Sequence, residues 1–485
     1  MTETKSRKIS KRIVVEGDLR LLTPTALGNG DAESLTDMPL LLDTAGKQPL
    51  PLLTGASIAG ALRNYLRAYE QGFHTPEVKG NHASLAAELF GAVKGDTGDS
   101  DSGDSGGEQS RLIVDDALAH EPTQAEVRDG VRIDGRTRTA EDKFKYDLEL
   151  LPAGVVFPLR FELLLGEGTD EDTLKRALAL ALHGLEASEI DLGGRKTRGF
   201  GRCVVERWQA TTYNLRDSRD DLLAWLSADH ADWGFALPQA AVRAGSAAEA
   251  LDVTLPQQDV DQRRVFSITA TFEIKSPLLI RSEAALENGA QPDVAHLHNS
   301  QHQPIVSGTS LAGVLRARAV RIVNTIGASI DLNSLFGRDM HREKGDPSRS
   351  RLIVRESAIE GGTTLVQNRV AIDRFTGGAL DTALFAEAPQ VGGDVELRLI
   401  IRDPNSKEKG LLLLLLKDLW TGDLPLGGTS SIGRGRLRGL RAEIADEGQV
   451  WQMHKQDGGI ELDDAARVSF EHYVDALNGQ QGATQ

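Results

Sequence analysis

Cysteine is almost absent from this sequence: Cys203 is the only one in 485 residues. A single cysteine excludes an intramolecular disulfide and a cysteine-rich zinc site, and such low usage is typical of a reducing compartment such as the cytoplasm. Long apolar runs are also missing, because the most apolar one, residues 411–416, is too short to span a bilayer. The basic residues 1–12 lack the apolar stretch of a secretory signal. We therefore expect a cytoplasmic protein with no membrane partner.

Positive charge is scarce relative to negative charge. The chain has 55 lysines and arginines against 71 aspartates and glutamates, a net charge of −16, which argues against a nucleic-acid partner when taken globally. The distribution is uneven, however, since basic residues crowd into 132–138, 195–202 and 434–438. Local basic strips can follow a phosphate backbone, so charge alone decides neither way.

An acidic segment interrupts the first half of the chain. Residues 96–108 contain five acidic residues and no basic one, separated mainly by glycine and serine. The ligand spacing does not fit a calcium loop. The composition predicts a disordered insert at about residues 95–110.

Four segments recur in the same order, which indicates an internal repeat. The pairs are PLLTGASIAGALR (51–63) and PIVSGTSLAGVLR (304–316); LFG with RLIV (89–91, 111–114) and the same letters (335–337, 351–354); VRIDGRT (131–137) and VAIDRFT (370–376); and LGGRKTRGFGR (192–202) and LGGTSSIGRGR (426–436). Four ordered matches are very improbable by chance, and the length suits two domains. The chain is therefore two copies of one domain.

Each copy shows the same series of strands and helices. A strand with apolar alternation (12–22; 264–274) precedes a helix that starts near Ser57 or Ser310, then come a short strand, a hairpin, a further strand, a second helix and a last strand. This mixture predicts an α+β fold with two tandem ferredoxin-like or RRM-like domains. The expected boundaries are 1–214 for the first domain, 215–263 for a linker with a short helix, 264–447 for the second domain and 448–485 for a C-terminal extension.

Two repeated motifs are candidates for anion binding. In the first, Ser57 and Ser310 are predicted to cap the helix start, with Arg63 and Arg316 nearby, although its glycines are as well explained by helix packing. The second motif, at 192–202, does not have the glycine spacing of a dinucleotide fingerprint. Its glycines would let the backbone approach a phosphate, and it is basic as well; the alternative is a glycine-rich turn. We favour an RNA contact.

Taken together, these motifs resemble the RAMP-superfamily backbone subunits of type III CRISPR effector complexes, which act in antiviral defence. The resemblance rests on Asp37-Met-Pro leading into 51–63, and on the other repeated segments, and it covers most of 12–210 and 265–440. It implies an RRM-like palm that holds crRNA and a β-hairpin thumb that wedges into the guide–target duplex. Segments 130–151 and 368–391 are similar to such thumbs.

The partners implied by this resemblance are crRNA, complementary target RNA and other subunits of the effector complex. The residues we predict to bind RNA are Ser57, Arg63, Arg132, Arg136, Arg195, Lys196, Arg198, Ser310, Arg316, Arg374, Arg434 and Arg436.

The resemblance also implies one catalytic aspartate per domain, in the loop between the first strand and the first helix. Asp37 matches this position, and Asp293 is its best counterpart, although Ala295 replaces Pro39 there. RNA supplies its own nucleophile, the 2′-OH, so positioning does much of the work. The carboxylate would act as a general base or hold a divalent ion, expected to be Mg²⁺. From the residues alone, Asp37 is also explained as a carboxylate that caps a turn.

Two alternatives remain open. The first alternative to target cleavage is a scaffold that binds crRNA without cutting. The second is a crRNA-processing endoribonuclease, which usually relies on histidine; no histidine recurs at equivalent positions of the copies. His296, His298 and His302 lie close together in one predicted loop, where solvated histidines are commoner than a metal site.

Overall fold

The computed structural model describes residues 8–30, 36–73, 75, 84–92, 108–135, 137, 139–228, 242–255, 261–282, 292–338, 348–456 and 459–479. The first sheet is built from β1 (Ile9–Leu21), β4 (Leu112–Val114), β8 (Val156–Gly166) and β9 (Cys203–Asn214). Every second residue of β8, from Phe157 to Leu165, is buried, because alternate side chains of a strand point to opposite faces. The sheet order is β9-β1-β8-β4, all antiparallel, with β10 (Val242–Ala244) added beside β9.

Two helices, α1 (Gly55–Gln71) and α3 (Glu171–Glu186), pack their apolar faces against this sheet. In chain order the unit reads strand, helix, strand, strand, helix, strand. With the strands numbered along the chain, their spatial order is 4-1-3-2, which is the ferredoxin-like arrangement.

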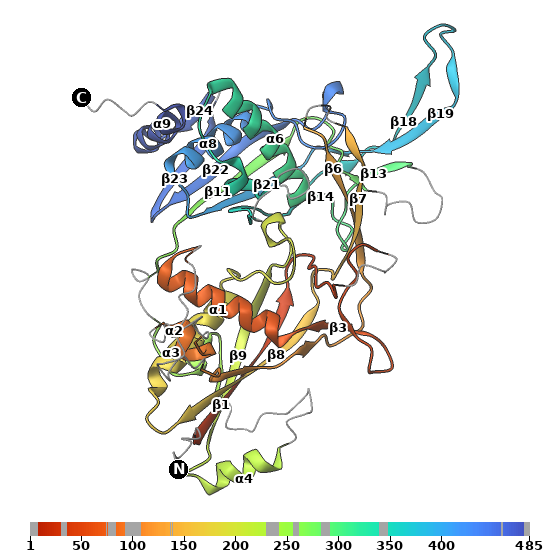
Figure 1. Ribbon diagram of the computed structural model, residues 1–485. Coiled ribbons are helices and arrows are strands. Elements are labelled where there is room, and N and C mark those ends of the chain that lie inside the picture. Colours follow the sequence, from red (N-terminus) through yellow and green to blue (C-terminus); the bar gives the residue numbers. More distant parts are fainter. Residues whose placement is uncertain are drawn as a thin grey trace, which may run out of the picture.

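The second unit repeats this topology (Figure 1). Its strands β11 (Val265–Ile274), β15 (Leu352–Val354), β21 (Asp394–Arg402) and β22 (Leu437–Asp446) lie in the order β22-β11-β21-β15, again 4-1-3-2. Its helices are α6 (Gly308–Ile326) and α8 (Ser406–Trp420). The predicted fold class, α+β with two tandem ferredoxin-like domains, is confirmed.

Segments outside the two repeats complete the cores. After β22 the chain adds β23 (Gln449–Gln456) and β24 (Gly459–Leu462) to the second sheet, and α9 (Asp464–Asn478) packs on α8. The leucine-rich run of α8 is therefore buried on nearly every side. In the first domain, β10 and α5 (Ala247–Ala250) pack on β9 and α3, although they lie in the segment we had assigned to the linker, where α4 (Arg219–Ser227) also lies.

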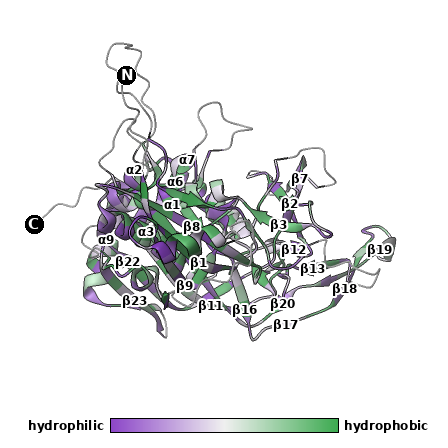
Figure 2. Cartoon of the chain, turned by 90° about the horizontal axis from the view of Figure 1, so that it is seen from below, coloured by the Kyte–Doolittle hydropathy of each residue, from purple (hydrophilic) through white to green (hydrophobic). Residues whose placement is uncertain are grey.

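A hairpin is inserted between the second and third core strands of each domain. It consists of β6 (Glu126–Ile133) and β7 (Ala140–Leu150) in the first domain, and of β18 (Gln367–Ile372) and β19 (Ala379–Ala388) in the second. At the tips, Oδ1 of Asp134 and of Asp373 accepts hydrogen bonds from the backbone N–H of Thr137 and Thr376, which explains the repeated Ile-Asp-x-x-Thr motif. The β18–β19 hairpin stands away from the rest of the chain in both views (Figures 1 and 2).

Short elements complete the chain. They are β2 (Leu42–Asp43), β3 (Leu50–Leu53), α2 (Leu85–Phe90), β5 (Ala117–Leu118), η1 (Lys196–Arg198), β12 (Arg281–Ser282), β13 (Val294–His296), β14 (Ile305–Val306), α7 (Leu332–Phe336), β16 (Ser357–Glu360), β17 (Thr363–Thr364), β20 (Gln390–Val391) and η4 (Ser430–Ile432). Among the described helices, none is long and apolar enough to cross a membrane.

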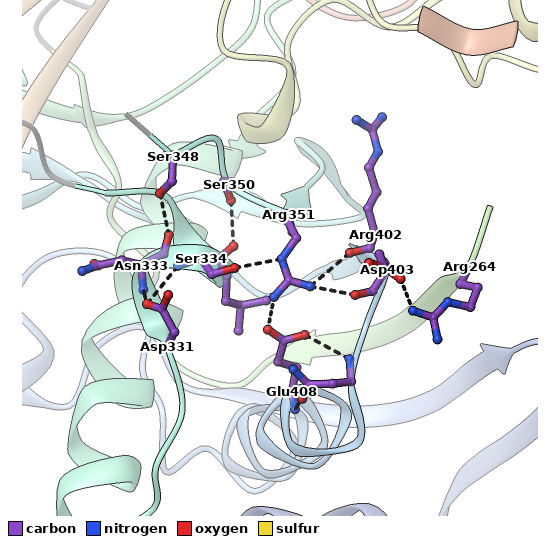
Figure 3. Close-up of polar contacts among 12 residues, drawn as sticks. Arg264, Asp331, Asn333, Ser334, Ser348, Ser350, Arg351, Arg402, Asp403 and Glu408 are labelled. Carbon is purple, nitrogen blue, oxygen red and sulfur yellow. Dashed lines mark hydrogen bonds and ion pairs between the residues drawn. The ribbon is translucent and has the colours of Figure 1, made fainter. Parts of the chain in front are cut away.

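The arginine of the repeated RLIV segment has a structural role. Arg351 donates from Nη1 to the carbonyl of Asp403 at 2.7 Å and forms an ion pair with Glu408 at the start of α8 (Figure 3). It therefore joins β15 to the end of β21 and to the following helix. In the same view the side chain of Arg402 points away from this network, toward the first domain.

Candidate RNA interface

Asp37 lies at the surface beside the first hairpin. Its Oδ2 accepts a hydrogen bond from the backbone N–H of Asp147 on β7 at 2.9 Å. The next residue, Met38, forms a parallel bridge with Leu148. The predicted catalytic carboxylate is therefore held by the descending strand of the hairpin.

Asp293 occupies the equivalent place in the second domain. Its Oδ2 accepts a hydrogen bond from the backbone N–H of Ala386 on β19 at 2.7 Å, and the next residue, Val294, pairs in parallel with Glu387. The geometry is the same in both domains. The residue after the aspartate pairs in parallel with a residue of the descending hairpin strand, and the aspartate accepts from the backbone N–H of the residue just before that one. This agreement holds although Ala295 replaces Pro39 in the sequence.

The surroundings of the two aspartates differ in the oxygen atoms that could bind a cation. Near Asp37, Oδ1 of Asp147 is buried and has no hydrogen-bond partner, and Asp129 pairs with Asp147 across the hairpin. In the second domain, Ala386 and Asn368 stand at these two positions. Mg²⁺ is bound in proteins by one or two carboxylates together with phosphate oxygens and water. The first site therefore fits a divalent ion better than the second, although no cluster of three or more ligating side chains occurs among the described residues.

The predicted helix caps at Ser57 and Ser310 were wrong by three residues. Thr54 and Ser307 are the N-cap residues, and their hydroxyls accept from the backbone N–H of Ser57 and Ser310, each at 3.3 Å. A capping side chain accepts from the third helical residue, so the serines provide the N–H and not the cap.

Arg63 and Arg316 join each long helix to the short helix that follows. Arg63 donates from Nη2 to the carbonyl of Gly91 at 3.0 Å, and Arg316 donates from Nη1 to that of Gly337 at 2.8 Å. These bonds account for the arginine that ends the first repeated motif.

The glycine motif is shaped by contacts within its own domain. A Cβ on Gly201 would lie 1.9 Å from the carbonyl oxygen of Leu192, and one on Gly435 would lie 1.8 Å from that of Leu426. Both glycines also have positive φ angles, 82° and 78°. They are therefore required for the closure of the turn, which favours the structural alternative for these two positions.

A basic cleft lies between the two domains, with a volume of about 1420 Å³. It is lined by residues of α1, the glycine motif and hairpin of the first domain, and β21 of the second domain. Thirteen of the lining residues are cationic: Arg67, Arg132, Arg195, Lys196, Arg198, Arg202, Arg263, Arg316, Arg338, Arg349, Arg355, Arg398 and Arg402. Only Glu189, Asp191 and Asp261 are acidic. Positive charge is thus concentrated here in a chain whose net charge is −16.

The cations of the cleft lower one another's pKa. Burial, followed by the charges of Arg316 and Arg195, lowers the pKa of Arg198 to about 10. Burial also lowers the pKa of Lys196, Arg202 and Arg402, each of which has neighbouring arginines. Crowded cations of this kind are stabilised by an anion with several charges, as in a phosphate backbone.

Five of the predicted RNA-binding residues line this cleft: Arg132, Arg195, Lys196, Arg198 and Arg316. Two of them bond to side chains of the first hairpin, of which Arg132 is itself a part. Arg195 donates to the hydroxyl of Tyr146 at 2.6 Å, and Arg132 forms an ion pair with Glu141 at 3.1 Å.

Other predicted residues lie elsewhere. Arg434 is buried and forms an ion pair with Glu387 at 2.8 Å, so it supports the base of the second hairpin. Arg374 is exposed at the tip of that hairpin, and Arg436 is exposed just before β22. Arg136 lies outside the described residues.

The most important omission concerns β21. Arg398 and Arg402 lie on the face of this strand opposite the core, because Leu397, Leu399 and Ile401 point inward. The period of two in this segment was visible in the sequence and places both arginines on the outward face, which also has Asp394 and Glu396.

His296 is buried and forms part of the second core. Its Nε2 lies 2.9 Å from the carbonyl of Ile305, and its Nδ1 accepts from the backbone N–H of Ile280 at 3.2 Å. The interpretation of this residue as a solvated loop histidine was wrong. Its neighbour two residues later, His298, bonds to the carbonyl of His296.

The fold and the cleft define the class of this protein: two ferredoxin-like domains in tandem, each with an inserted hairpin, around a cationic cleft. The chain belongs to the RAMP superfamily, whose family model matches residues 18–204 and 271–438, once in each domain. No curated protein matches the chain in sequence. Membership of this superfamily supports a CRISPR-associated role in RNA binding.

Proposed function

We propose that the chain is a crRNA-binding backbone subunit of a type III CRISPR effector complex that cleaves complementary target RNA at two positions, one in each domain. The observation that carries this proposal is the equivalent placement of Asp37 and Asp293 against the descending strands of their hairpins. A hairpin inserted into the guide–target duplex would bring the adjoining target phosphate to the aspartate.

The interdomain cleft is the proposed path of the crRNA backbone. Its arginines come from both domains, so an RNA strand bound there crosses from one copy to the next. Phosphate contacts of this kind give affinity without sequence preference, which suits a subunit that must accept any guide.

The proposed cleavage uses the target's own 2′-OH as the nucleophile. The aspartate accepts the proton of this hydroxyl while its oxygen attacks the adjacent phosphorus, and the 5′-oxygen of the next nucleotide leaves and takes a proton from water. The products are a 2′,3′-cyclic phosphate and a 5′-OH end. A divalent ion bound with Asp37 and Asp147 would neutralise charge on the phosphate. Positioning by the hairpin contributes much of the acceleration.

The test is the ladder of products from a complementary target RNA in the assembled complex. Asp37→Asn should remove one product and Asp293→Asn a neighbouring one, with crRNA and target affinity unchanged. The matched control is Asp43→Asn, at the end of β2, where the side chain accepts a hydrogen bond from the nearby backbone N–H of Ala45; it should leave every product in place. Chelation of Mg²⁺ should remove both products.

An unchanged ladder in both variants would show that the chain is a scaffold. The hydrogen bonds of Asp37 and Asp293 to the hairpin strands are also what a purely structural carboxylate would form, so this alternative remains the second candidate.

A further inference from the structure

The junction between the two domains is formed by specific polar pairs. Arg128 of the first hairpin forms a bidentate ion pair with Glu356, and both side chains are buried. Arg355 donates to Asp191 at 2.8 Å, and Arg198 donates to the carbonyl of Phe336 at 2.9 Å. The contact is also close at the backbone, because a Cβ on Gly199 would lie 2.4 Å from the amide nitrogen of Glu356.

This junction joins two different surfaces. We call Glu126, Arg128, Asp191 and Arg198 the outgoing surface of the first domain, and Phe336, Arg355 and Glu356 the incoming surface of the second. A head-to-tail contact between unlike surfaces can be repeated indefinitely if every copy has both of them. Each domain of this chain has one surface left over: the outgoing surface of the second domain and the incoming surface of the first.

The structural repeat identifies the residues of these two remaining surfaces. The elements η1 and η4 follow Arg195 and Thr429, which both have left-handed backbones, and the registers of the two hairpins match residue for residue. On the outgoing surface of the second domain, Leu365, Gln367, Pro425 and Ile432 take the places of Glu126, Arg128, Asp191 and Arg198. On the incoming surface of the first domain, Phe90, Asp115 and Asp116 take the places of Phe336, Arg355 and Glu356.

A second copy of the chain would not fit this surface. Asp116 would face Gln367, whereas Glu356 faces Arg128. Asp115 would face Pro425, whereas Arg355 faces Asp191. Ile432 has no donor for the carbonyl of Phe90, which already accepts from Arg63. Both carboxylates would lose water without gaining an ion pair, and such burial is costly.

The outgoing surface of the second domain is apolar and uncovered. Three of its four residues are apolar, and two of them, Leu365 and Ile432, are 41% and 55% exposed. A Cβ on Gly433 would meet no atom within 4 Å, in contrast to the equivalent Gly199, which packs on the second domain. Exposed apolar residues at positions where the other copy forms a covered, polar junction indicate a site of protein association.

We propose that the outgoing surface of the second domain binds a different protein with an apolar, non-acidic contact face, and that the chain does not polymerise with itself. The inference concerns the same assembly as the proposed function but is independent of cleavage. A complex that cuts RNA normally can contradict it, and an inactive complex can support it.

The first experiment places a photo-crosslinking amino acid, p-benzoylphenylalanine, at Ile432 in the assembled effector complex. Irradiation should join the chain to a different polypeptide, identified by mass spectrometry. A crosslink to a second copy, or none at this position, overturns the proposal. The matched control position is Val450 on β23, which is 56% exposed away from this surface and should give no such product.

The second experiment tests whether these residues prevent self-association of the chain. Purified wild-type chain should remain monomeric over a concentration series in analytical ultracentrifugation, and concentration-dependent oligomers would overturn the proposal. The variant Gln367→Arg/Ile432→Arg restores the two donors of the internal junction and should associate head to tail as concentration rises. The reversed variant Gln367→Glu/Ile432→Glu should stay monomeric. A folded restored variant that also stays monomeric would show that these residues do not decide the partner.

Discussion

At the residue scale, His296 makes the second domain sensitive to acid. Burial lowers its pKa to about 4, while an unfolded histidine has a pKa of about 6.5. Both states are neutral above pH 6.5, so its contribution to stability is complete there. As the pH falls from about 6.5 toward 4, only the unfolded chain takes up the proton, and the free energy of unfolding decreases by about 3 kcal/mol in total.

Urea unfolding at a series of pH values checks this expectation. The wild type should lose stability between pH 6.5 and pH 4 more steeply than His296→Gln. The control is His302→Asn, an exposed residue with a left-handed backbone that asparagine tolerates, and it should follow the wild type. Parallel curves for the wild type and His296→Gln would contradict the assignment.

Arg398 and Arg402 allow a direct test of the cleft. Replacement of either residue by glutamate should weaken crRNA binding and reduce the slope of log K against log salt by about 0.7 for each lost contact with a single strand. The variant Arg219→Glu, on the exposed helix α4, should change neither quantity. Binding isotherms at several salt concentrations give both numbers, and unchanged slopes would place the RNA elsewhere.

Local charge in the sequence identified some of the residues that line the interdomain cleft. The segments that contribute Arg195, Lys196 and Arg198 to the cleft were recognisable by local charge. Arg434 belongs to a similar local cluster but is buried against Glu387, a residue 47 positions away. Such long-range pairing cannot be read from composition, and the same limitation concealed Arg355 and Arg402.

At the element scale, Thr54 and Ser57 at the start of α1 have different roles: Thr54 is the N-cap, and Ser57 provides the backbone N–H that it accepts from. Thr54→Ala removes the side chain that accepts from Ser57 and should lower the free energy of unfolding by about 1 kcal/mol. Ser57→Ala keeps the backbone N–H and should cost less. Chemical denaturation of the two variants measures the difference, and a larger loss for Ser57→Ala would reverse the assignment.

The chain on either side of residues 93–107 is closed by a hydrogen bond. The backbone N–H of Glu108 donates to the carbonyl of Ala92 at 3.3 Å, so the two ends of this segment already meet. Deletion of 93–107 should therefore leave the melting temperature within about 2 °C and crRNA affinity within a few-fold. Thermal unfolding and RNA titration test this, and a large loss of affinity would mean that the acidic segment contacts RNA or a neighbour.

At the scale of the whole molecule, the buried pair of Arg128 and Glu356 holds the domains together. Burial raises the pKa of Glu356 even though Arg128 opposes this effect. Glu356→Ala removes one of the two carboxylates that pair with Arg128, since Glu126 still forms an ion pair with it, and should cost about 1.5–3 kcal/mol. The double variant Arg128→Met/Glu356→Leu should recover much of this loss. Urea unfolding of the three chains measures the coupling, and equal stability of the single variant and the wild type would show that the pair is not important for the junction.

The topology of each domain could be predicted from sequence, because the repeat gives two independent copies of the same pattern of strands and helices. The arrangement of the two domains could not. It depends on contacts such as Arg198 with the carbonyl of Phe336, and a backbone acceptor leaves no signature in the sequence. The basic cleft is a consequence of that arrangement, so most of its residues could be recognised only in the folded chain.

The continuous chain between the domains also determines how much binding free energy each junction must supply. Linked domains meet at an effective concentration in the millimolar range, so the internal junction needs little affinity of its own and can rely on a few ion pairs that fix its geometry. The outer junction at Ile432 has no covalent link and must supply all of its binding free energy from the contact itself. Apolar side chains such as Leu365 provide that free energy at any salt concentration, whereas surface charges are screened. A rise in salt concentration should therefore weaken the affinity for RNA well before it dissociates the neighbouring protein.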